Sequence, residues 1–168
     1  MEQNTLPGQP YAAALRFLSY RPRSEAEVGR RLSRHYSPDL VHRVMATLQE
    51  QGLLDDAAFA RYWRENREQH RPKGQGILRQ ELLRLGVPRE TIGEALEGFD
   101  APGNAYRAGT KLARRLAQSD YPQFRQRMSG YLHRRGFSRT VVRETLERLW
   151  RELPDSLHGD EHTHEDED

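Results

Sequence analysis

The sequence predicts an all-α protein of three tandem repeats, each a helix-turn-helix-like set of three helices, that together form an elongated, curved molecule. Three observations support this fold class. Apolar positions recur at intervals of about 50 residues, as at Leu32, Leu82 and Leu132. Helix start and stop signals follow one another along the chain. No stretch has the alternating pattern of a half-buried strand.

The first repeat opens with a short helix over about residues 10–20 and continues with a strong helix-start signal. In RSEAEVGRRLSRH, Ser24 and Glu27 have the spacing of a capping box. Val28 and Leu32 then fall on one helical face. This pattern predicts a second helix over 24–35.

SPDLVHRVMATLQEQG predicts the third helix, over 38–51. Ser37 is the expected N-cap, Pro38 occupies the first turn, and Gly52 follows the last turn. The apolar residues of this segment form one stripe, which consists of Val41, Val44, Met45 and Leu48.

The second and third repeats show the same order of signals. The expected helices are 56–70, 73–85 and 88–97 in the second repeat and 103–118, 121–135 and 139–152 in the third. Gly86 and Gly136 should end the middle helix of each. The last helices carry stripes of Ile92, Ala95, Leu96 and Phe99, and of Val141, Val142, Thr145, Leu146 and Leu149.

These elements predict five segments. A flexible N-terminus (1–9) precedes the three repeats (10–54, 55–101 and 102–153), and Pro102-Gly103 marks the joint before the third. An acidic, His-containing tail (154–168) ends the chain. His158, His162 and His164 could hold a metal weakly, but the tail lacks caps and periodicity, so we expect a disordered, solvated segment.

Composition narrows the class of protein. Charged residues make up 31% of the 168 residues, which suits a repeat protein with little deep interior. The chain has no cysteine, which excludes disulfides and thiolate metal sites. No apolar run approaches the ~18 residues of a membrane span, and the N-terminus lacks a signal-peptide pattern. We therefore expect a cytoplasmic protein without a membrane partner.

Charge is distributed unevenly along the sequence. Segment 155–168 holds seven acids and no Lys or Arg. Without it, 27 basic residues face 18 acidic ones, although the net charge of the whole chain is only +2. A body this basic favours polyanions or acidic protein surfaces as partners, and high solubility is the alternative explanation.

GLLDDAAFARYW, residues 52–63, contains a carboxylate pair, Asp55 and Asp56. Such a pair can serve acid–base chemistry or bind a hard cation, but both uses need further converging ligands. The alternative is an N-cap for the helix that carries Phe59, Tyr62 and Trp63 on one face. We favour the cap. PKGQG does not fit the spacing of a phosphate loop, and we expect no enzyme, metal, cofactor or small-molecule substrate.

Basic residues are the remaining functional signal. Arginine strongly outnumbers lysine, which suits bidentate contacts with phosphate or carboxylate. Three of the arginines (64, 67 and 71) share one helical face by their spacing. The predicted recombinase- or DNA-binding set consists of Arg30, Arg31, Arg34, Arg64, Arg67, Arg71, Lys73, Arg79, Arg84, Lys111, Arg114 and Arg115.

Several stretches resemble the RecX family, bacterial regulators of the RecA recombinase. The resemblance covers about residues 10–153 and is most specific in GLLDDAAFARYWRENR. ILRQELLRLGVPRETIGEAL and SEAEVGRRLSRHYSPDLVHRVMATL also resemble family segments, and the third repeat is a weaker match apart from YLHRRGFSRTVVRETL. Tyr36 stands where many relatives carry glycine. The family motif maps onto Gly52, Leu53, Leu54, Asp55, Asp56, Phe59 and Trp63.

The resemblance implies tandem three-helix repeats that bind in the groove of the RecA filament on single-stranded DNA. Such a protein bridges neighbouring protomers, blocks ATP hydrolysis and strand exchange, and is not an enzyme. The implied partners are the RecA filament and, by direct contact, single-stranded DNA, and the implied processes are DNA recombination, repair and the SOS response. Two alternatives stay open: a helix-turn-helix-like DNA-binding protein that needs no recombinase, and a helical scaffold for another protein.

Overall fold

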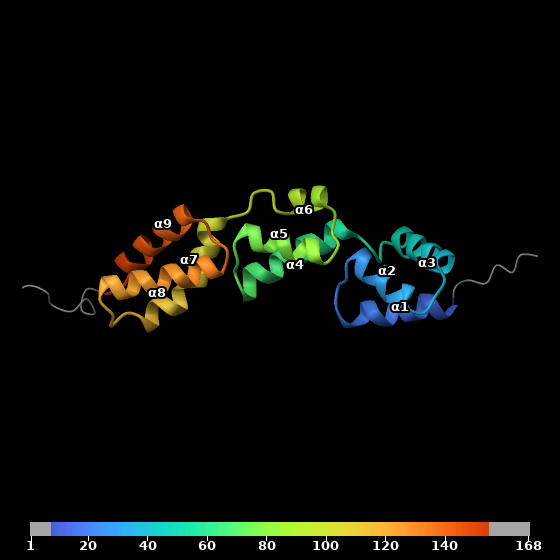
Figure 1. Cartoon of the computed structure of the whole chain (residues 1–168), viewed down its shortest axis with the longest axis horizontal. Helices are drawn as coiled ribbons and strands as arrows, with labels where there is room; N and C mark the ends of the chain where they lie inside the picture. The colour runs from blue at the N-terminus through green and yellow to red at the C-terminus, as the bar shows by residue number, and fades with distance from the viewer. Residues whose placement is uncertain (1–7, 155–168) are drawn as a thin grey trace, which may run out of the picture. The chain divides into compact units, whose positions relative to one another are not determined.

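The computed structural model describes residues 8–154, and this part of the chain has nine helices and no strand (Figure 1). The predicted all-α class is confirmed. The predicted acidic tail lies almost wholly in 155–168, and most of the predicted flexible N-terminus lies in 1–7; both of these segments are outside the described residues. The helices are α1 (Gly8–Tyr20), α2 (Glu25–Ser33), α3 (Pro38–Glu50), α4 (Asp56–His70), α5 (Gln75–Arg84), α6 (Arg89–Ala95), α7 (Ala101–Arg115), α8 (Tyr121–Arg134) and α9 (Arg139–Arg151).

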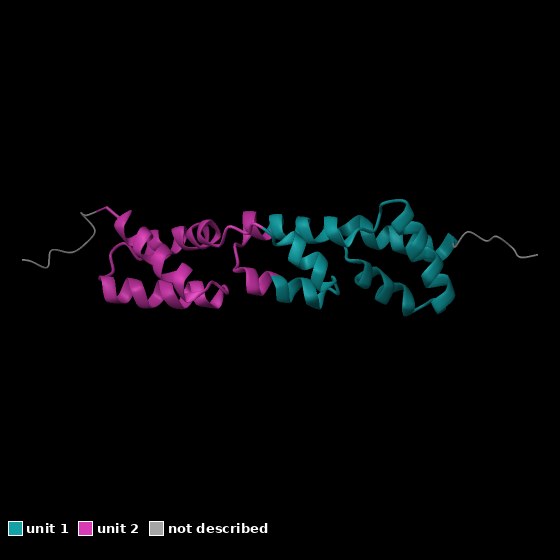
Figure 2. Cartoon of the chain, turned by 90° about the horizontal axis from the view of Figure 1, so that it is seen from above, with its two compact units in different colours: residues 1–66, 79–97 teal, residues 67–78, 98–168 magenta. Residues whose placement is uncertain are grey.

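The described helices fall into two compact units (Figure 2). Unit 1 holds residues 8–66 and 79–97, and unit 2 holds 67–78 and 98–154. The boundary runs through α4 and α5. The middle sequence repeat therefore contributes residues to both units.

Unit 1 contains one apolar core formed by α1, α2 and α3. α2 contributes Val28 and Leu32, and α3 contributes Val41, Val44 and Leu48, all of them predicted from the spacing. Burying one such side chain stabilises the fold by about 1.5–3 kcal/mol. Helices this short are marginal alone, so this shared core is what holds them.

Unit 2 has a second core formed by α7, α8 and α9. Phe124, Met128 and Leu132 line α8 and are fully buried, and Leu146 and Leu149 face them from α9. α7 contributes mainly small side chains to this core, which are Ala105, Ala108 and Ala113. Within residues 8–154, no helix combines the length and apolar character that crossing a membrane requires.

Three glycines end helices in the same way, as the sequence predicted for them. Gly52, Gly86 and Gly136 have φ values of +69°, +82° and +84°. At Gly86 the amide donates to the Leu83 carbonyl (3.0 Å), and the next amide donates to the Leu82 carbonyl (3.1 Å). These two bonds form a Schellman motif, which needs a left-handed residue and therefore favours glycine.

The serine caps follow the sequence signals at Ser24 and Ser138 but not at Ser37. Ser24 and Glu27 form the predicted capping box, with Ser24 Oγ accepting from the Glu27 amide (3.2 Å) and the Glu27 carboxylate accepting from the Ser24 amide (3.0 Å). Ser138 caps α9. Ser37 was expected to cap α3, but its side chain makes no capping bond. This first turn is exposed, so water can satisfy its amides.

The end of α6 differs from the prediction. The helix stops at Ala95 instead of residue 97. Gly98 adopts a φ of +64°, which turns the chain out of the helical path. Phe99 was predicted on the α6 stripe, but it lies beyond this turn and is only half buried.

α7 begins two residues before the expected start of the first helix of the third repeat. Pro102-Gly103, which was expected at the joint before this repeat, lies in the first turn of α7. Asp100 is the N-cap, and its carboxylate accepts from the Gly103 amide (2.9 Å). A Cβ on Gly103 would lie 1.9 Å from Asp100 Oδ2, so a larger residue there would require the Asp100 side chain to shift. Proline fits the first turn because its missing N–H would have had no helical partner.

Candidate interaction surfaces

The carboxylates of Asp55 and Asp56 bind the backbone amides of two different helices. Asp55 Oδ1 accepts from the Ala58 amide (3.0 Å) and so caps its own helix, α4, as predicted. Asp56 Oδ1 accepts from the Glu25 amide at the start of α2 (2.9 Å). Among residues 8–154, no group of three or more His, Asp or Glu side chains is placed to hold a metal ion. The hydrogen bonds from the Ala58 and Glu25 amides give the pair a structural role at two helix N-termini.

The environment of Asp56 is unusual for a carboxylate. Burial, the largest influence, raises its pKa, and nearby carboxylates raise it further. The hydrogen bond from the Glu25 amide acts in the opposite direction, but the net pKa lies above the usual value. The Asp56 carboxylate thus accepts a backbone hydrogen bond in surroundings that disfavour its negative charge.

The remaining residues of the 52–63 motif divide into core and surface. Leu54 and Phe59 are buried. The rings of Phe59 and Trp63 lie 5.8 Å apart, and Trp63 Nε1 donates to Glu81 on α5 (2.9 Å). Leu53 is 45% exposed. The motif thus joins α4 to its neighbours in unit 1 while leaving one leucine at the surface.

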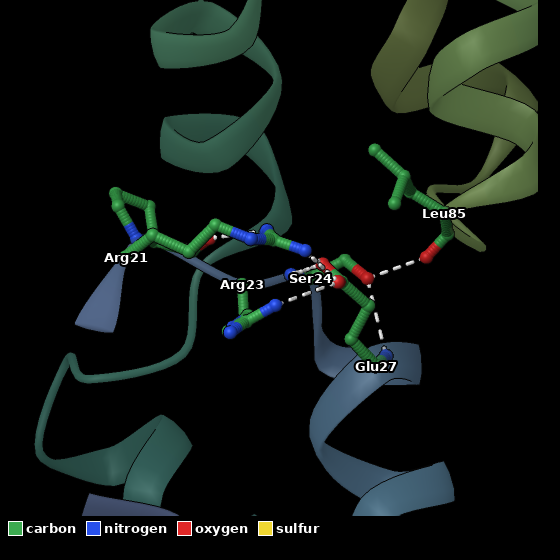
Figure 3. Close-up of polar contacts among 6 residues, drawn as sticks. Arg21, Arg23, Ser24, Glu27 and Leu85 are labelled. Atoms are coloured by element: carbon green, nitrogen blue, oxygen red, sulfur yellow. Dashed lines mark hydrogen bonds and ion pairs between the residues drawn. The ribbon is translucent and has the colours of Figure 1, made fainter. Parts of the chain in front are cut away.

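A joint between the first and second repeats lies within unit 1 (Figure 3). Ser24 Oγ donates to the carbonyl of Leu85, just past the end of α5. Gly86 packs closely against Ala26. A Cβ added to Gly86 would lie only 2.3 Å from the Ala26 Cβ. The N-terminus of α2 therefore satisfies a carbonyl at the C-terminus of α5.

Two arginines beside this first joint are neutralised within the unit. Figure 3 shows Arg21 and Arg23 converging on the carboxylate of Glu27, with which both form ion pairs. Burial, the largest influence, acts to raise the pKa of Glu27. Hydrogen bonds from Arg21 and the Ser24 amide and the charges of both arginines outweigh it, so the net pKa lies below the usual value.

A second joint, between the second and third repeats, lies within unit 2 and has the same plan. The Gly74 amide donates to the carbonyl of Arg135, just past the end of α8 (2.7 Å). A Cβ on Gly74 would lie 2.0 Å from the carbonyl oxygen of Gly136, so only glycine fits. Gly74 stands 50 residues after Ser24, and Arg135 stands 50 residues after Leu85.

The second joint carries a basic pocket that no acidic side chain of residues 8–154 lines. Its volume is about 410 Å³. Among the described residues, those that line it are Arg71, Lys73, Ile77, Tyr131, Arg134 and Arg135. Arg135 Nη1 donates to the Pro72 carbonyl (3.3 Å), and its guanidinium lies 4.6 Å from the centre of the Tyr131 ring.

This basic pocket brings together only two members of the predicted binding set, Arg71 and Lys73. Arg134 and Arg135 were missing from that set. A usable signal was present in YLHRRG, where two adjacent arginines precede the helix-ending Gly136. When the repeats are aligned at their 50-residue spacing, these arginines fall at the joint, opposite the basic Arg71-Pro72-Lys73 turn.

The other predicted basic residues are distributed over both units. Unit 1 holds Arg30, Arg31, Arg34, Arg64, Arg79 and Arg84. Unit 2 holds Arg67, Arg71, Lys73, Lys111, Arg114 and Arg115. Nine of these side chains are exposed, and three (Arg64, Arg67 and Lys73) are half buried.

Arg64 has a structural contact that the sequence did not indicate. Its Nη1 donates to the carbonyls of Ala95 (3.0 Å) and Glu97 (2.8 Å), at the C-terminal end of α6. A guanidinium there satisfies carbonyls that lack helical partners. Replacing Arg64 would therefore disturb α6 as well as any binding surface.

An apolar pocket of about 770 Å³ lies on unit 1, between the α1–α2 region and the start of α4. Of the five large hydrophobic side chains that are exposed in the described residues, four line it, namely Leu15, Tyr20, Leu53 and Tyr62. Clustered exposed apolar side chains are typical of protein–protein interaction sites.

Family comparisons match all three repeats. The family model described as the first three-helix domain of RecX matches residues 11–48. The models of the second and third three-helix domains match residues 55–96 and 103–146.

Curated relatives match over most of their length. "Regulatory protein RecX" of Chlorobium limicola (strain DSM 245 / NBRC 103803 / 6330) is 33% identical over 145 residues, which cover 86% of this chain and 91% of the relative. The protein of the same name from Mycobacterium ulcerans (strain Agy99) is 38% identical over 143 residues, covering 82% and 83%.

Solved structures agree with the fold. The crystal structure of RecX from Lactobacillus salivarius has a TM-score of 0.74 over 85% of this chain and 96% of that chain, at 23% identity. A second crystal structure, of a regulatory protein RecX, has a TM-score of 0.71 at 27% identity and covers 84% of this chain and 73% of that one. With three domain models matched in order and relatives above 30% identity over most of the chain, this protein belongs to the RecX family of regulatory proteins.

Proposed function

We propose that this protein regulates the RecA recombinase. It binds in the groove of the RecA filament on single-stranded DNA, bridges neighbouring protomers, and thereby blocks ATP hydrolysis and strand exchange. The observation that carries the proposal is the ordered match of all three repeats to the three RecX domains. A cytoplasmic location follows from this function, because the recombinase acts on chromosomal DNA.

The repetition of one joint design supports the proposal that this protein bridges neighbouring protomers. The two joints link successive repeats through a helix N-terminus and a helix C-terminal carbonyl, at Ser24 and Leu85 and again at Gly74 and Arg135. Repeats linked in this way can present their cations to successive protomers. Weak contacts then add, because the later ones form within an existing complex.

The surface chemistry supports two kinds of contact. The exposed arginines of the predicted set meet acidic recombinase surface and DNA phosphate. The apolar pocket around Leu53 and Tyr62 meets a recombinase protomer, because interface cores are rich in aromatic side chains and poor in charge.

A recombinase ATPase assay on single-stranded DNA tests the function directly. Increasing amounts of this protein should lower the rate of ATP hydrolysis to a plateau, reached when the filament is saturated. A rate that stays constant over a range in which the protein demonstrably binds the filament would contradict the proposal.

Surface variants test the two contacts separately. Tyr62→Ser should weaken binding to the filament at least about fivefold, since central interface aromatics typically cost more than 1 kcal/mol. Tyr121→Ser is the matched control, because the two side chains are 42% and 39% exposed but lie on different units. Equal losses in both variants would argue against the apolar contact.

The arginine contact is best tested without Arg64, whose guanidinium holds α6. The triple variant Arg71→Ala, Arg79→Ala and Arg84→Ala changes three exposed members of the set. It should raise the protein concentration needed for half-maximal inhibition. Unaltered inhibition would reject a binding role for these three residues.

The basic pocket of unit 2 favours a second candidate function, DNA binding that needs no recombinase. A plain DNA-binding protein should lose affinity with salt, with a slope near −0.9 per phosphate contact on duplex DNA. It should also act in the absence of RecA. Affinity for DNA without any effect on recombinase ATP hydrolysis would select this alternative.

A further inference from the structure

We infer that the basic pocket at the second joint binds a backbone phosphate of single-stranded DNA. The inference rests on the proposed function, because it names which part of this protein meets the DNA of the filament. The pocket is formed entirely within unit 2, by the turn before α5, the start of α5 and the end of α8.

The residue four positions after the basic turn differs between the two joints. Arg21-Pro22-Arg23 and Arg71-Pro72-Lys73 occupy equivalent positions, 50 residues apart. At the first joint, Glu27 pairs with both arginines. At the second joint, the equivalent position is Ile77, an apolar residue that lines the pocket. The acid that neutralises the first turn is therefore absent from the position where the second turn would use it.

The second joint also gains cations from the opposite repeat. Arg135 stands at the position equivalent to Leu85, so a guanidinium replaces an isobutyl group. Arg134 lines the same pocket. Four cationic side chains thus share a space of about 410 Å³ with Ile77 and Tyr131. Cations gathered in this way raise the local concentration of anions.

One of these cations is held in place before any ligand arrives. The Arg135 guanidinium is fixed by the Pro72 carbonyl and by the face of Tyr131. A pre-oriented guanidinium loses less conformational entropy on binding than a flexible one. The close approach of Gly74 to the Gly136 carbonyl fixes the two backbone segments that carry these side chains.

Size and chemistry favour a nucleic-acid phosphate over a protein carboxylate. At roughly 30 Å³ per water, the pocket has room for about a dozen waters, which is enough for a phosphodiester group and its flanking sugars. A strand offers one phosphate per nucleotide, so several cations can each find an anion.

Fluorescence anisotropy with a labelled oligothymidylate, in the absence of recombinase, tests the pocket. The double variant Arg71→Ala and Arg134→Ala should bind about tenfold more weakly at low salt. The steepness of its log K against log salt plot should fall by roughly 0.7 for each phosphate of the single strand that the variant no longer neutralises. The matched control is Arg107→Ala and Arg127→Ala, which removes the same charge from exposed residues of unit 2 outside the pocket.

A second pair of variants separates charge from folding. Ile77→Glu supplies the counterion found at the first joint, and Ile77→Gln changes size and polarity almost equally without the charge. We expect Ile77→Glu to lose DNA affinity several-fold more than Ile77→Gln, with similar thermal melting of both variants. Equal affinities in this pair, or equal slopes in the arginine pair and its control, would overturn the inference.

Failure of the inference and failure of the proposed function have different signatures. If the wild type inhibits recombinase ATP hydrolysis while pocket and control variants bind DNA alike, the pocket inference is wrong and the function stands. If pocket variants alone lose DNA binding but the wild type leaves the recombinase unaffected, the function is wrong and the pocket stands. Pocket variants that bind DNA normally but fail to bind DNA-free recombinase would reassign the pocket to an acidic protein surface and overturn the inference.

Discussion

Single side chains in this protein frequently serve a helix other than their own. Asp56 begins α4 but accepts a hydrogen bond from the first turn of α2. Ser24 caps α2 and also donates to the carbonyl of Leu85 after α5. Arg64 on α4 holds the end of α6. Short helices leave many terminal amides and carbonyls unpaired, and these side chains satisfy them.

The role of Asp56 can be separated from its charge. Asp56→Asn keeps an oxygen that accepts from the Glu25 amide and removes a carboxylate whose pKa is raised by burial. We expect a stability within about 0.5 kcal/mol of the wild type, whereas Asp56→Ala should cost about 1 kcal/mol. Urea unfolding measures both. Equal losses would mean that the negative charge itself is needed, contrary to the structural role.

Glu27 should make stability depend on pH in the acidic range. Its pKa is lowered in the folded protein, so its contribution is fully present above the unfolded pKa of about 4.3 and is lost as the pH falls through the folded value. Glu27→Gln should be less stable by about 1–2 kcal/mol at pH 7. The difference in urea midpoint between the wild type and Glu27→Gln should shrink as the pH is lowered. A difference that stays constant down to about pH 3 would refute the stabilising role of the Glu27 carboxylate.

At the scale of elements, a joint between repeats is built from backbone as much as from side chains. The second joint has no serine equivalent to Ser24. Instead the Gly74 amide itself reaches the Arg135 carbonyl, and Gly136 packs against Ile77. Because Gly74 and Gly136 have no side chain, α5 and the end of α8 can approach this closely.

Two glycines near the start of α5 should respond oppositely to alanine. Gly74→Ala places a Cβ against the Gly136 carbonyl and should cost about 1–3 kcal/mol. Gly76 has nothing within 4 Å of its Cβ position, so Gly76→Ala should stabilise the helix by about 0.5–1 kcal/mol. Thermal melting of the two variants compares them. A similar change in both would show that the close approach is not present in solution.

At the scale of the whole molecule, sequence repeats and compact units do not coincide. Family models match three domains in order, whereas contacts divide the described residues into two units whose boundary crosses α4 and α5. The middle repeat contributes buried side chains such as Phe59 to unit 1 and Leu78 to unit 2. A repeat too small to enclose a core of its own completes it with residues of its neighbours.

The elongated, curved shape that tandem repeats predict remains a prediction. A compact globule of this length would have a radius of gyration of about 15 Å. Small-angle X-ray scattering of the monomer should give a clearly larger value, because the repeats of a tandem array contact only their neighbours. A value near that of the globule would contradict the tandem arrangement.

The sequence by itself determined the helices, their stripes and most of their ends, because these depend on local chemistry. Leu32, Leu82 and Leu132 are buried as their spacing predicts, and Gly86 and Gly136 adopt the left-handed conformation expected of them. The family also followed from local motifs, above all GLLDDAAFARYW. A 3.6-residue period and a cap can be identified from neighbouring residues alone.

Only the tertiary structure decided which residues far apart in the chain meet. The sequence showed two equivalent basic turns but not that Glu27 neutralises one of them while Arg134 and Arg135 reinforce the other. It placed Arg64 on a binding surface without indicating its bond to α6. Such contacts depend on how helices pack, and packing is fixed by the whole set of buried side chains and backbone approaches, which no local pattern contains.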